Sequence, residues 1–348
     1  MFDTWETGSH ITFKANPVWY QPPKLEQIFV RIVPDDAAQE AAILAGDSDI
    51  GAFLSSDQIE KLEAGGKVKV VPVTSGYNEA WFLNVNPDTA RPFMQDVNVR
   101  KAIALATDRF SIVKDLLVES VNPVNVTFWD MTPGFETDSL KPYPYDPEQA
   151  KKLLDDAGWK DSDGDGIRDK MVDGAKVDLI VRFITNQREL RKNIQAVVEQ
   201  QWKQVGIGAE LVNYSSDVFW NGYNDGGPQA QGLYEVAEYS SVQNAYPDPD
   251  TDGFTCAQIV NADNPDGSND QGYCNPALDE LFKKQAVEVD PTKRKELFNQ
   301  IEQTIYDDYI YIGMWKDPDL WSVSSRLKNV KFSGVYPFWN AYEWEITE

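Results

Sequence analysis

Strand-like and helix-like segments alternate along this 348-residue chain. Residues 10–33 carry alternating apolar and polar side chains on either side of a proline-containing loop, which predicts two strands. Helices are predicted over 35–46 and 55–66, where each pattern ends in glycine, and strands over 67–73 and 78–86. Helices and strands in this order typically form a mixed sheet with helical cover, so an α/β lobe is expected here.

The rest of the chain repeats this order of elements. Helices are predicted over 98–118 (as one helix or two in succession), 146–159, 189–206 and twice within 275–308, and strands over 176–184, 209–215 and 309–315. No internal repeat and no low-complexity linker is found. A chain of this length can bury two sizeable cores, which predicts a second α/β lobe.

The charge balance excludes two classes of partner. The chain has 32 Lys and Arg against 56 Asp and Glu, a net charge of -24. Such a field repels nucleic acid and anionic membrane surfaces, so neither is expected to bind. No apolar run approaches the roughly 20 residues of a membrane helix. The chain is rich in aromatic residues, with eleven Trp, fifteen Tyr and sixteen Phe. They are expected either to fill a core or to line a cleft in which their rings stack on a ligand.

The sequence shows few of the residue groups and motifs that enzymes use for catalysis. His10 is the only histidine and begins a strand-like segment, which disfavours a Ser-His-Asp or Cys-His nucleophile. Motifs for a nucleophile elbow, a P-loop and a dinucleotide fold are missing from the sequence, so no cofactor is expected to be required. A carbohydrate hydrolase with paired carboxylates remains as an alternative, because 56 acidic residues always permit some pair.

The two cysteines lie in one polar segment. Cys256 and Cys274 bound "CAQIVNADNPDGSNDQGYC", which offers little material for a core. We predict a disulfide that closes this loop and places the protein in an oxidising compartment. The alternative is two unrelated free thiols.

The segment "DSDGDGIRD" (161–169) is a candidate calcium loop. Its proposed ligands, at positions 1, 3, 5, 7 and 9, are Asp161, Asp163, Asp165, the Ile167 carbonyl and Asp169. The EF-hand pattern is incomplete, because position 12 is a valine. The alternative is a solvated Asp/Gly turn. A calcium-stabilised adhesion or interaction module is a rival class, although calcium here would brace a turn without defining the function.

Several segments carry a resemblance. The stretch "PFMQDVNVRKAIALATDRFSIVKDLL" (92–117) resembles the hallmark of the family 5 extracellular solute-binding proteins, receptors of ABC importers for peptides, nickel and oligosaccharides. Residues 8–20, 41–50, 150–159 and 274–315 resemble further motifs of this family in the family's order. The resemblance therefore extends over nearly the whole chain.

The resemblance implies an α/β, periplasmic-binding-protein-like fold of class II type with two lobes. Residues 1–88 with 317–348 would form part of the first lobe, and 89–316 the second. Members of the family have a long N-terminal part that this chain lacks, so the first lobe is expected to be incomplete and the missing N-terminal part to be its partner.

The implied function is capture without chemistry. The resemblance implies a monomeric extracytoplasmic protein, periplasmic or tethered as a cell-surface lipoprotein, that closes two lobes on an oligopeptide and delivers it to an ABC permease. An oligosaccharide is the alternative ligand.

The residues expected to bind the ligand depart from the family pattern at one position. In peptide receptors of this family an aspartate binds the peptide amino group, but Ala245 holds its position in "NAYPDP" (244–249), which disfavours a free α-amine. Aromatic rings with neutral amides nearby also suit sugars. Trp81, Trp220 and Tyr239 face either a cleft or the core, whereas the loop residue Trp129 is harder to explain as core. The candidate ligand residues are Trp81, Trp129, Trp220, Tyr239, Gln243, Asn244, Tyr246 and Asp248.

Overall fold

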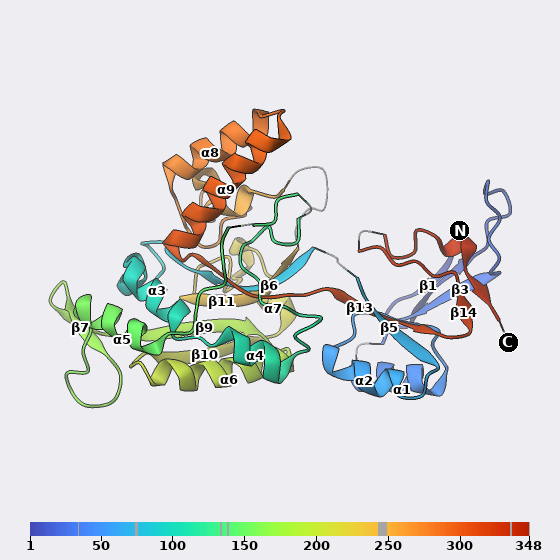
Figure 1. Ribbon diagram of the computed structural model, residues 1–348, viewed down its shortest axis with the longest axis horizontal. Helices are drawn as coiled ribbons and strands as arrows, with labels where there is room; N and C mark the ends of the chain where they lie inside the picture. The colour runs from blue at the N-terminus through green and yellow to red at the C-terminus, as the bar shows by residue number, and fades with distance from the viewer. Residues whose placement is uncertain are drawn as a thin grey trace. The chain divides into compact units, whose positions relative to one another are not determined.

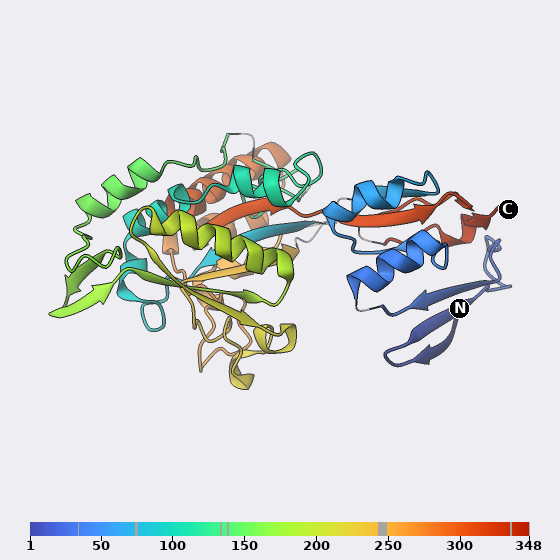
Figure 2. The ribbon, with the colours of Figure 1, turned by 90° about the horizontal axis from the view of Figure 1, so that it is seen from below.

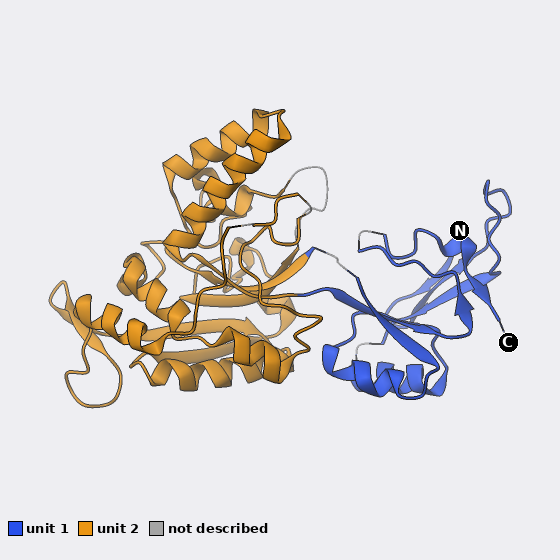
Figure 3. Ribbon diagram, in the orientation of Figure 1, with its two compact units in different colours: residues 1–76, 317–348 blue, residues 77–316 orange. Residues whose placement is uncertain are grey.

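The computed structural model describes residues 1–33, 35–73, 76–132, 134–137, 139–242, 249–334 and 336–347. They form two compact units (Figure 3). Unit 1 consists of residues 1–76 and 317–348, and unit 2 of residues 77–316. Each unit is built from strands and helices, as the sequence predicts.

The boundary differs from the sequence-based one, which placed residues 77–88 in the first lobe. Strand β6 (Tyr77–Leu83) is hydrogen-bonded into the sheet of unit 2. Its residues from Asn78 to Leu83 are buried there. Burial of this strand between two neighbours therefore assigns it to unit 2.

Unit 1 contains two small three-stranded sheets. The antiparallel sheet β1-β2-β3 has strands β1 (Phe2–Glu6), β2 (His10–Lys14) and β3 (Gln27–Arg31). The second sheet, in the order β4-β13-β5, has β4 (Ile50–Gly51), β13 (Asp319–Ser324) and β5 (Val68–Val73). The remaining elements are α1 (Asp36–Ala45), α2 (Ile59–Glu63) and the pair β14 (Leu327–Lys328) and β15 (Glu345–Ile346). Strand β1 was not predicted.

Local signals set the ends of α1. The Asp35 carboxylate accepts a hydrogen bond of 2.7 Å from the Ala38 backbone N–H, which satisfies a free donor of the first turn. Gly46 ends the helix with φ of 79°, in the left-handed region that glycine adopts at low cost. Both ends agree with the sequence prediction.

Unit 2 is organised around a five-stranded sheet in the order β10-β9-β11-β6-β12 (Figure 1). The strands besides β6 are β9 (Ile180–Asn186), β10 (Gly208–Tyr214), β11 (Val236–Val242) and β12 (Tyr311–Lys316). Strand β9 runs parallel to β10 and β11, and β6 runs antiparallel to β11 and β12. A separate hairpin of β7 (Asp169–Val172) and β8 (Ala175–Asp178) follows the candidate calcium loop.

Helices cover both faces of this sheet (Figures 1 and 2). They are α3 (Val97–Leu105), α4 (Arg109–Leu116), α5 (Pro147–Asp156), α6 (Glu189–Lys203), α7 (Ser216–Phe219), α8 (Pro276–Val287) and α9 (Pro291–Asp308). The predicted segment 98–118 is two helices, because the Asp108 carboxylate caps α4 at the Ser111 N–H. Among the described residues, no helix is both long and apolar enough to cross a membrane.

Neighbouring residues of β6 belong to different cores. Trp81 packs in one buried cluster with Phe183 and Trp202, and Phe82 packs in the other with Tyr239. Successive side chains of a strand point to opposite faces, so the sheet separates these clusters. Figure 2 shows α6 across one face of the sheet.

Candidate functional site

A cavity of 210 Å³ lies in unit 2 beside the end of β11, and we call it the β11 cavity. Its aromatic wall consists of Phe82, Phe128, Tyr239 and Phe254. Tyr239 and Phe82 are stacked, with ring centroids 4.1 Å apart and planes 6° apart. Burial raises the pKa of the Tyr239 phenol well above its usual value, so the ring is neutral at physiological pH.

The polar wall carries carboxylates, amides and a hydroxyl. It includes Gln229, Ser241, Asp250, Asp270 and Gln271. Gln229 Nε2 donates a 3.0 Å hydrogen bond to Asp270 Oδ2. Burial raises the pKa of Asp270 to about 7. Within the described part of the chain, no Lys, Arg or His lines the cavity.

Two polar atoms of this wall are buried without a partner. Gln271 is 2% exposed, and its Nε2 donates a 2.7 Å hydrogen bond to the Ile310 carbonyl. Gln271 Oε1 and Ser241 Oγ have no hydrogen-bond partner in the parts of the chain that the structure describes. Buried polar atoms are normally satisfied, so these two atoms are available to a ligand or to water.

A disulfide closes the loop that carries part of the polar wall. Cys256 and Cys274 are bonded, with Cα atoms 4.5 Å apart, which confirms the predicted bridge. The side-chain amide of Asn269, within this loop, donates hydrogen bonds to the carbonyls of Thr255 (3.0 Å) and Tyr273 (2.7 Å). These contacts hold the neighbouring Asp270 in place. Sequence reasoning identified the bridge but missed the residues it positions.

Two predicted ligand residues lie together at this site. Tyr239 is 8% exposed and lines the β11 cavity. Trp220, directly after α7, is 49% exposed, and its ring meets Tyr239 edge-on at 5.3 Å between centroids. An exposed indole against a cavity wall can stack on a ligand.

The structure places two other predicted residues in cores. Trp81 is fully buried on the opposite face of the sheet, with its ring centroid 5.1 Å from that of Phe183. Trp129 is also fully buried, and its indole N–H donates a 2.7 Å hydrogen bond to the Asp250 carbonyl. The loop position favoured a ligand-facing Trp129. This loop instead supplies a core side chain, because the ring packs against Phe298 of α9 at 5.5 Å.

The remaining predicted ligand residues, Gln243, Asn244, Tyr246 and Asp248, lie outside the described residues. Their participation in binding stays a prediction.

The candidate calcium loop brings three carboxylates together. One oxygen from each of Asp161, Asp163 and Asp165 lies within 4.8 Å of the others, and all three residues are exposed. The backbone N–H groups of Gly164 and Gly166 donate to the Asp161 carboxylate at 2.6 and 3.0 Å. An oxygen-only group of this kind suits a hard cation such as Ca²⁺.

The other two predicted calcium ligands fall outside this three-carboxylate group. Asp169 is buried and accepts hydrogen bonds from the Ser162 N–H at 3.0 Å and the Ser162 hydroxyl at 2.7 Å. Ile167 donates its N–H to Asp165 Oδ1 at 2.7 Å. Lys176 Nζ lies 2.5 Å from Asp163 Oδ2 and so neutralises part of the charge. Calcium binding remains a prediction.

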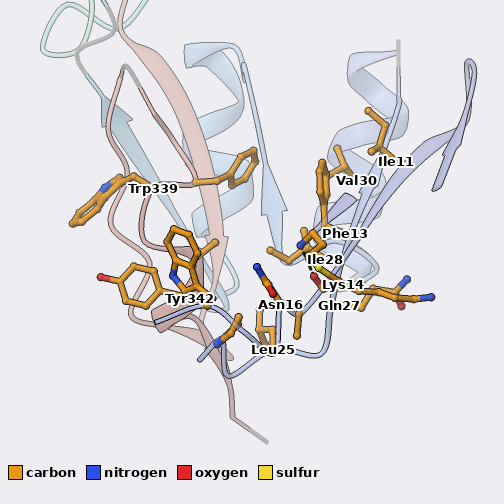
Figure 4. A pocket seen from close by; sticks show the side chains of 16 residues that line it. Ile11, Phe13, Lys14, Asn16, Leu25, Gln27, Ile28, Val30, Trp339 and Tyr342 are labelled. Atoms are coloured by element: carbon orange, nitrogen blue, oxygen red, sulfur yellow. Dashed lines mark hydrogen bonds between the residues drawn. The ribbon is translucent and has the colours of Figure 1, made fainter. Parts of the chain in front are cut away.

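Unit 1 has a larger and more apolar hollow of 660 Å³, which we call the unit 1 groove. Figure 4 shows Phe13, Ile28 and Val30 on one side and Trp339 and Tyr342 on the other. Phe13 belongs to β2, and Ile28 and Val30 belong to β3. The groove therefore lies between one small sheet and the C-terminal segment of the chain.

Known proteins resemble this chain in sequence and in fold. The sequence model described as "Bacterial extracellular solute-binding proteins, family 5 Middle" matches residues 1–254. Over 100% of its length the chain is 26% identical to the oligopeptide-binding protein AppA of Bacillus subtilis strain 168, of which it covers 61%. It is also 26% identical, over 94% of its length, to the oligopeptide-binding protein OppA of Mycobacterium tuberculosis H37Rv, of which it covers 53%.

A solved structure of AppA from Bacillus subtilis in complex with a nonapeptide matches with a TM-score of 0.80 at 25% identity. That match covers 100% of this chain and 66% of AppA. The oligopeptide-binding protein of Thermus thermophilus, complexed with a pentapeptide, matches with a TM-score of 0.83 at 23% identity and shows the same fold over 99% of this chain and 62% of that one. The chain thus spans 53 to 61% of the length of the two curated relatives above.

Proposed function

Because the chain belongs to family 5 of the bacterial extracellular solute-binding proteins, we propose that it captures oligopeptides as the substrate-binding component of an ABC importer. The family consists of solute-binding proteins rather than enzymes, so the proposed activity is reversible binding. The observation that carries the proposal is the match over the whole chain to oligopeptide-binding AppA, in both sequence and fold.

The β11 cavity supports a role in recognising part of such a ligand. Its 210 Å³ is below the roughly 300 Å³ at which pockets for whole small molecules begin. A cavity of this size suits one side chain or one end of a longer molecule. The exposed ring of Trp220 beside Tyr239 offers a further apolar contact.

Location and partners follow from the same proposal. Family members are extracellular, and the Cys256–Cys274 disulfide agrees with an oxidising compartment. We propose that the protein acts as a monomer, in a periplasm or as a cell-surface lipoprotein, and releases its peptide to an ABC permease. Further polypeptide of the same protein, corresponding to the part of its relatives not spanned here, would cover the apolar unit 1 groove.

The natural polypeptide should be purified, and any small molecules bound to it identified by mass spectrometry after denaturation. Binding of the emptied protein to peptides of three to nine residues and to oligosaccharides is then measured by calorimetry. We expect peptides to co-purify and to bind at micromolar concentrations or tighter, with no binding of sugars. Binding of oligosaccharides alone would overturn the proposal in favour of the sugar alternative.

A pair of aromatic variants tests the site. Trp220→Ala should weaken peptide binding at least about fivefold, because one aromatic contact contributes on the order of 1 kcal/mol beyond its buried area. Trp5→Ala is the matched control, since Trp5 is 63% exposed in unit 1 and does not line the β11 cavity. Equal loss in both variants would argue against the proposed site.

A further inference from the structure

Among the described residues that line the β11 cavity, no basic side chain balances the acidic ones. Both charged residues of its wall, Asp250 and Asp270, are acidic. Asp270 lies between Gln229, which donates to one of its oxygens, and Tyr234, whose hydroxyl donates to its backbone carbonyl at 3.2 Å. A carboxylate removed from water without a cation beside it is costly, which favours any ligand that brings a positive charge.

The unpartnered atoms in the same wall are acceptors. Gln271 Oε1 is fixed as the acceptor end of its amide, because Nε2 is held by the Ile310 carbonyl. Ser241 Oγ can accept as well as donate. An ammonium group has three N–H donors and no acceptor, and a guanidinium has five donors, so either matches a wall of acceptors. A neutral apolar group would leave these atoms unsatisfied.

The aromatic wall completes the match. Phe82, Phe128, Tyr239 and Phe254 line the same cavity as the polar groups. The long methylene stem of a basic side chain packs on apolar surface while its charged end reaches polar atoms. Ring faces also attract cations.

We propose that the β11 cavity is a specificity subsite for a cationic group of the bound peptide, an ammonium or a guanidinium, held by Asp270, Gln271 and Ser241. This inference rests on the proposed function of peptide capture. The group comes either from a lysine or arginine side chain or from the peptide's α-amine, and the experiment separates these sources.

Four peptides of otherwise identical sequence test the subsite on the natural polypeptide. They carry lysine or its neutral analogue norleucine at one position, each with a free or an acetylated N-terminus, and the position is scanned along the peptide. We expect the best lysine peptide to bind at least about tenfold tighter than its norleucine partner, because a charge-assisted hydrogen bond stabilises more than a neutral one. Retention of this ratio after acetylation assigns the side chain, and preference for a free amine in all peptides assigns the α-amine.

Substitutions test whether the preference for lysine over norleucine arises from the β11 cavity. Asp270→Asn keeps the shape of the side chain and should reduce the lysine-to-norleucine ratio to near one. Asp266→Asn is the matched control, because Asp266 is an exposed carboxylate in the same disulfide loop that does not line the cavity, and it should keep the ratio. If Asp270→Asn does not fold by circular dichroism, Ser241→Ala replaces it, with an expected loss of about threefold.

Proton release gives a second readout. A bound cation stabilises the ionised Asp270, so its pKa of about 7 falls and the protein releases a fraction of a proton at neutral pH. Tyr234 and Tyr239 lie close enough to interact with the same carboxylate, but their raised pKa values keep them neutral. Asp250 is the other carboxylate among the described lining residues. Calorimetry in buffers of different ionisation enthalpy should detect this release with lysine peptides and lose it in Asp270→Asn.

The two failures are distinguishable. Equal binding of all four peptides would overturn the subsite and leave peptide capture standing. Absence of binding for every peptide, with no co-purified peptide in the natural protein, would overturn the proposed function and the subsite with it.

Discussion

Unit 1 and unit 2 share the same alternation of strands and helices, but their apolar side chains are covered to different degrees. Unit 2 buries two clusters on the two faces of one five-stranded sheet. Unit 1 carries the apolar 660 Å³ groove of Figure 4 and a second hollow of 730 Å³ that includes Phe29, Phe53 and Trp321. Rings such as Phe2, Trp5 and Phe29 remain more than half exposed in unit 1. Apolar alternation thus predicts a strand but does not say which part of a protein covers it.

Paired tryptophan substitutions should give the largest difference between the units. Trp81→Ala in unit 2 removes a fully buried ring and should lower the free energy of unfolding by about 3–5 kcal/mol. Trp19→Ala in unit 1 removes a ring that is 45% exposed and should cost about 0.5 kcal/mol or less. Urea denaturation followed by circular dichroism measures both. Similar costs would show that the unit 1 groove is packed in solution.

Loss of the disulfide should come next. Replacing Cys256 and Cys274 by serine opens a bridge with a sequence separation of 18, which should cost roughly 3 kcal/mol of stability in the chain-entropy estimate. Reduction of the natural protein is the matching chemical control. If the variant were as stable as the natural protein, the noncovalent contacts of the loop would be enough to hold it, and the disulfide would not contribute to stability.

The buried carboxyl of Glu238 should make unit 2 sensitive to pH. Burial, together with the neighbouring Glu79 carboxylate, raises the pKa of Glu238 well above its ordinary value of 4.5. The unfolded chain therefore ionises first, and the free energy of unfolding falls as pH rises above 4.5, by up to about 1.4 kcal/mol per pH unit. Asp270, with its pKa raised from 3.8 to about 7, acts in the same direction.

Glu238→Gln should flatten this dependence, and Glu119→Gln, an exposed residue of unit 2, should not. Thermal unfolding between pH 5 and pH 8 measures the slopes. Parallel slopes in all three proteins would exclude Glu238 as the source.

Calcium should have the smallest effect. The side chains of Asp161, Asp163 and Asp165 are exposed, and extracellular-type sites bind at about 0.1–1 mM. At 1 mM calcium the stabilisation should be about 0.4–1.4 kcal/mol. A thermal shift with calcium, absent in Asp161→Asn and weaker with magnesium, would support the site. If calcium does not change the melting temperature of the natural protein, the segment is a solvated turn without bound metal, in which Lys176 pairs with Asp163.

Local signals in the sequence predicted much of the fold. Asp35 and Gly46, the limits of the predicted helix over 35–46, gave the ends of α1, and the two helices predicted within 275–308 are α8 and α9. The family resemblance supplied the fold class, which the comparisons support. Strand β1 went unrecognised because its residues, Phe2–Glu6, are mostly exposed and lack a buried face to set a pattern.

The candidate site was harder to predict. Tyr239 was among the candidates and lines the β11 cavity. The loop position of Trp129 pointed to a ligand although its ring is buried, and nothing in the sequence showed whether Trp81 faces a cleft or a core. Asp270 and Gln271 looked like ordinary loop residues, because their burial arises from contacts with Gln229 and Ile310, which lie some 40 residues away in sequence. Their hydrogen bonds to residues distant in sequence, which the sequence does not reveal, distinguish them from their polar neighbours in the loop.

The path of the chain between the units has a consequence for synthesis on the ribosome. Unit 2 is one continuous stretch, which the chain enters through β6 and leaves through β12, and these strands are antiparallel neighbours with Asn78 opposite Lys316. All residues of unit 2 are therefore made before β13, the central strand of the β4-β13-β5 sheet of unit 1. Since domains fold as units during translation, residues 1–76 have to wait through the synthesis and folding of unit 2 with their apolar strands uncovered. Within this stretch of sequence, residues 1–76 are therefore more exposed to aggregation and proteolysis during synthesis than unit 2 is.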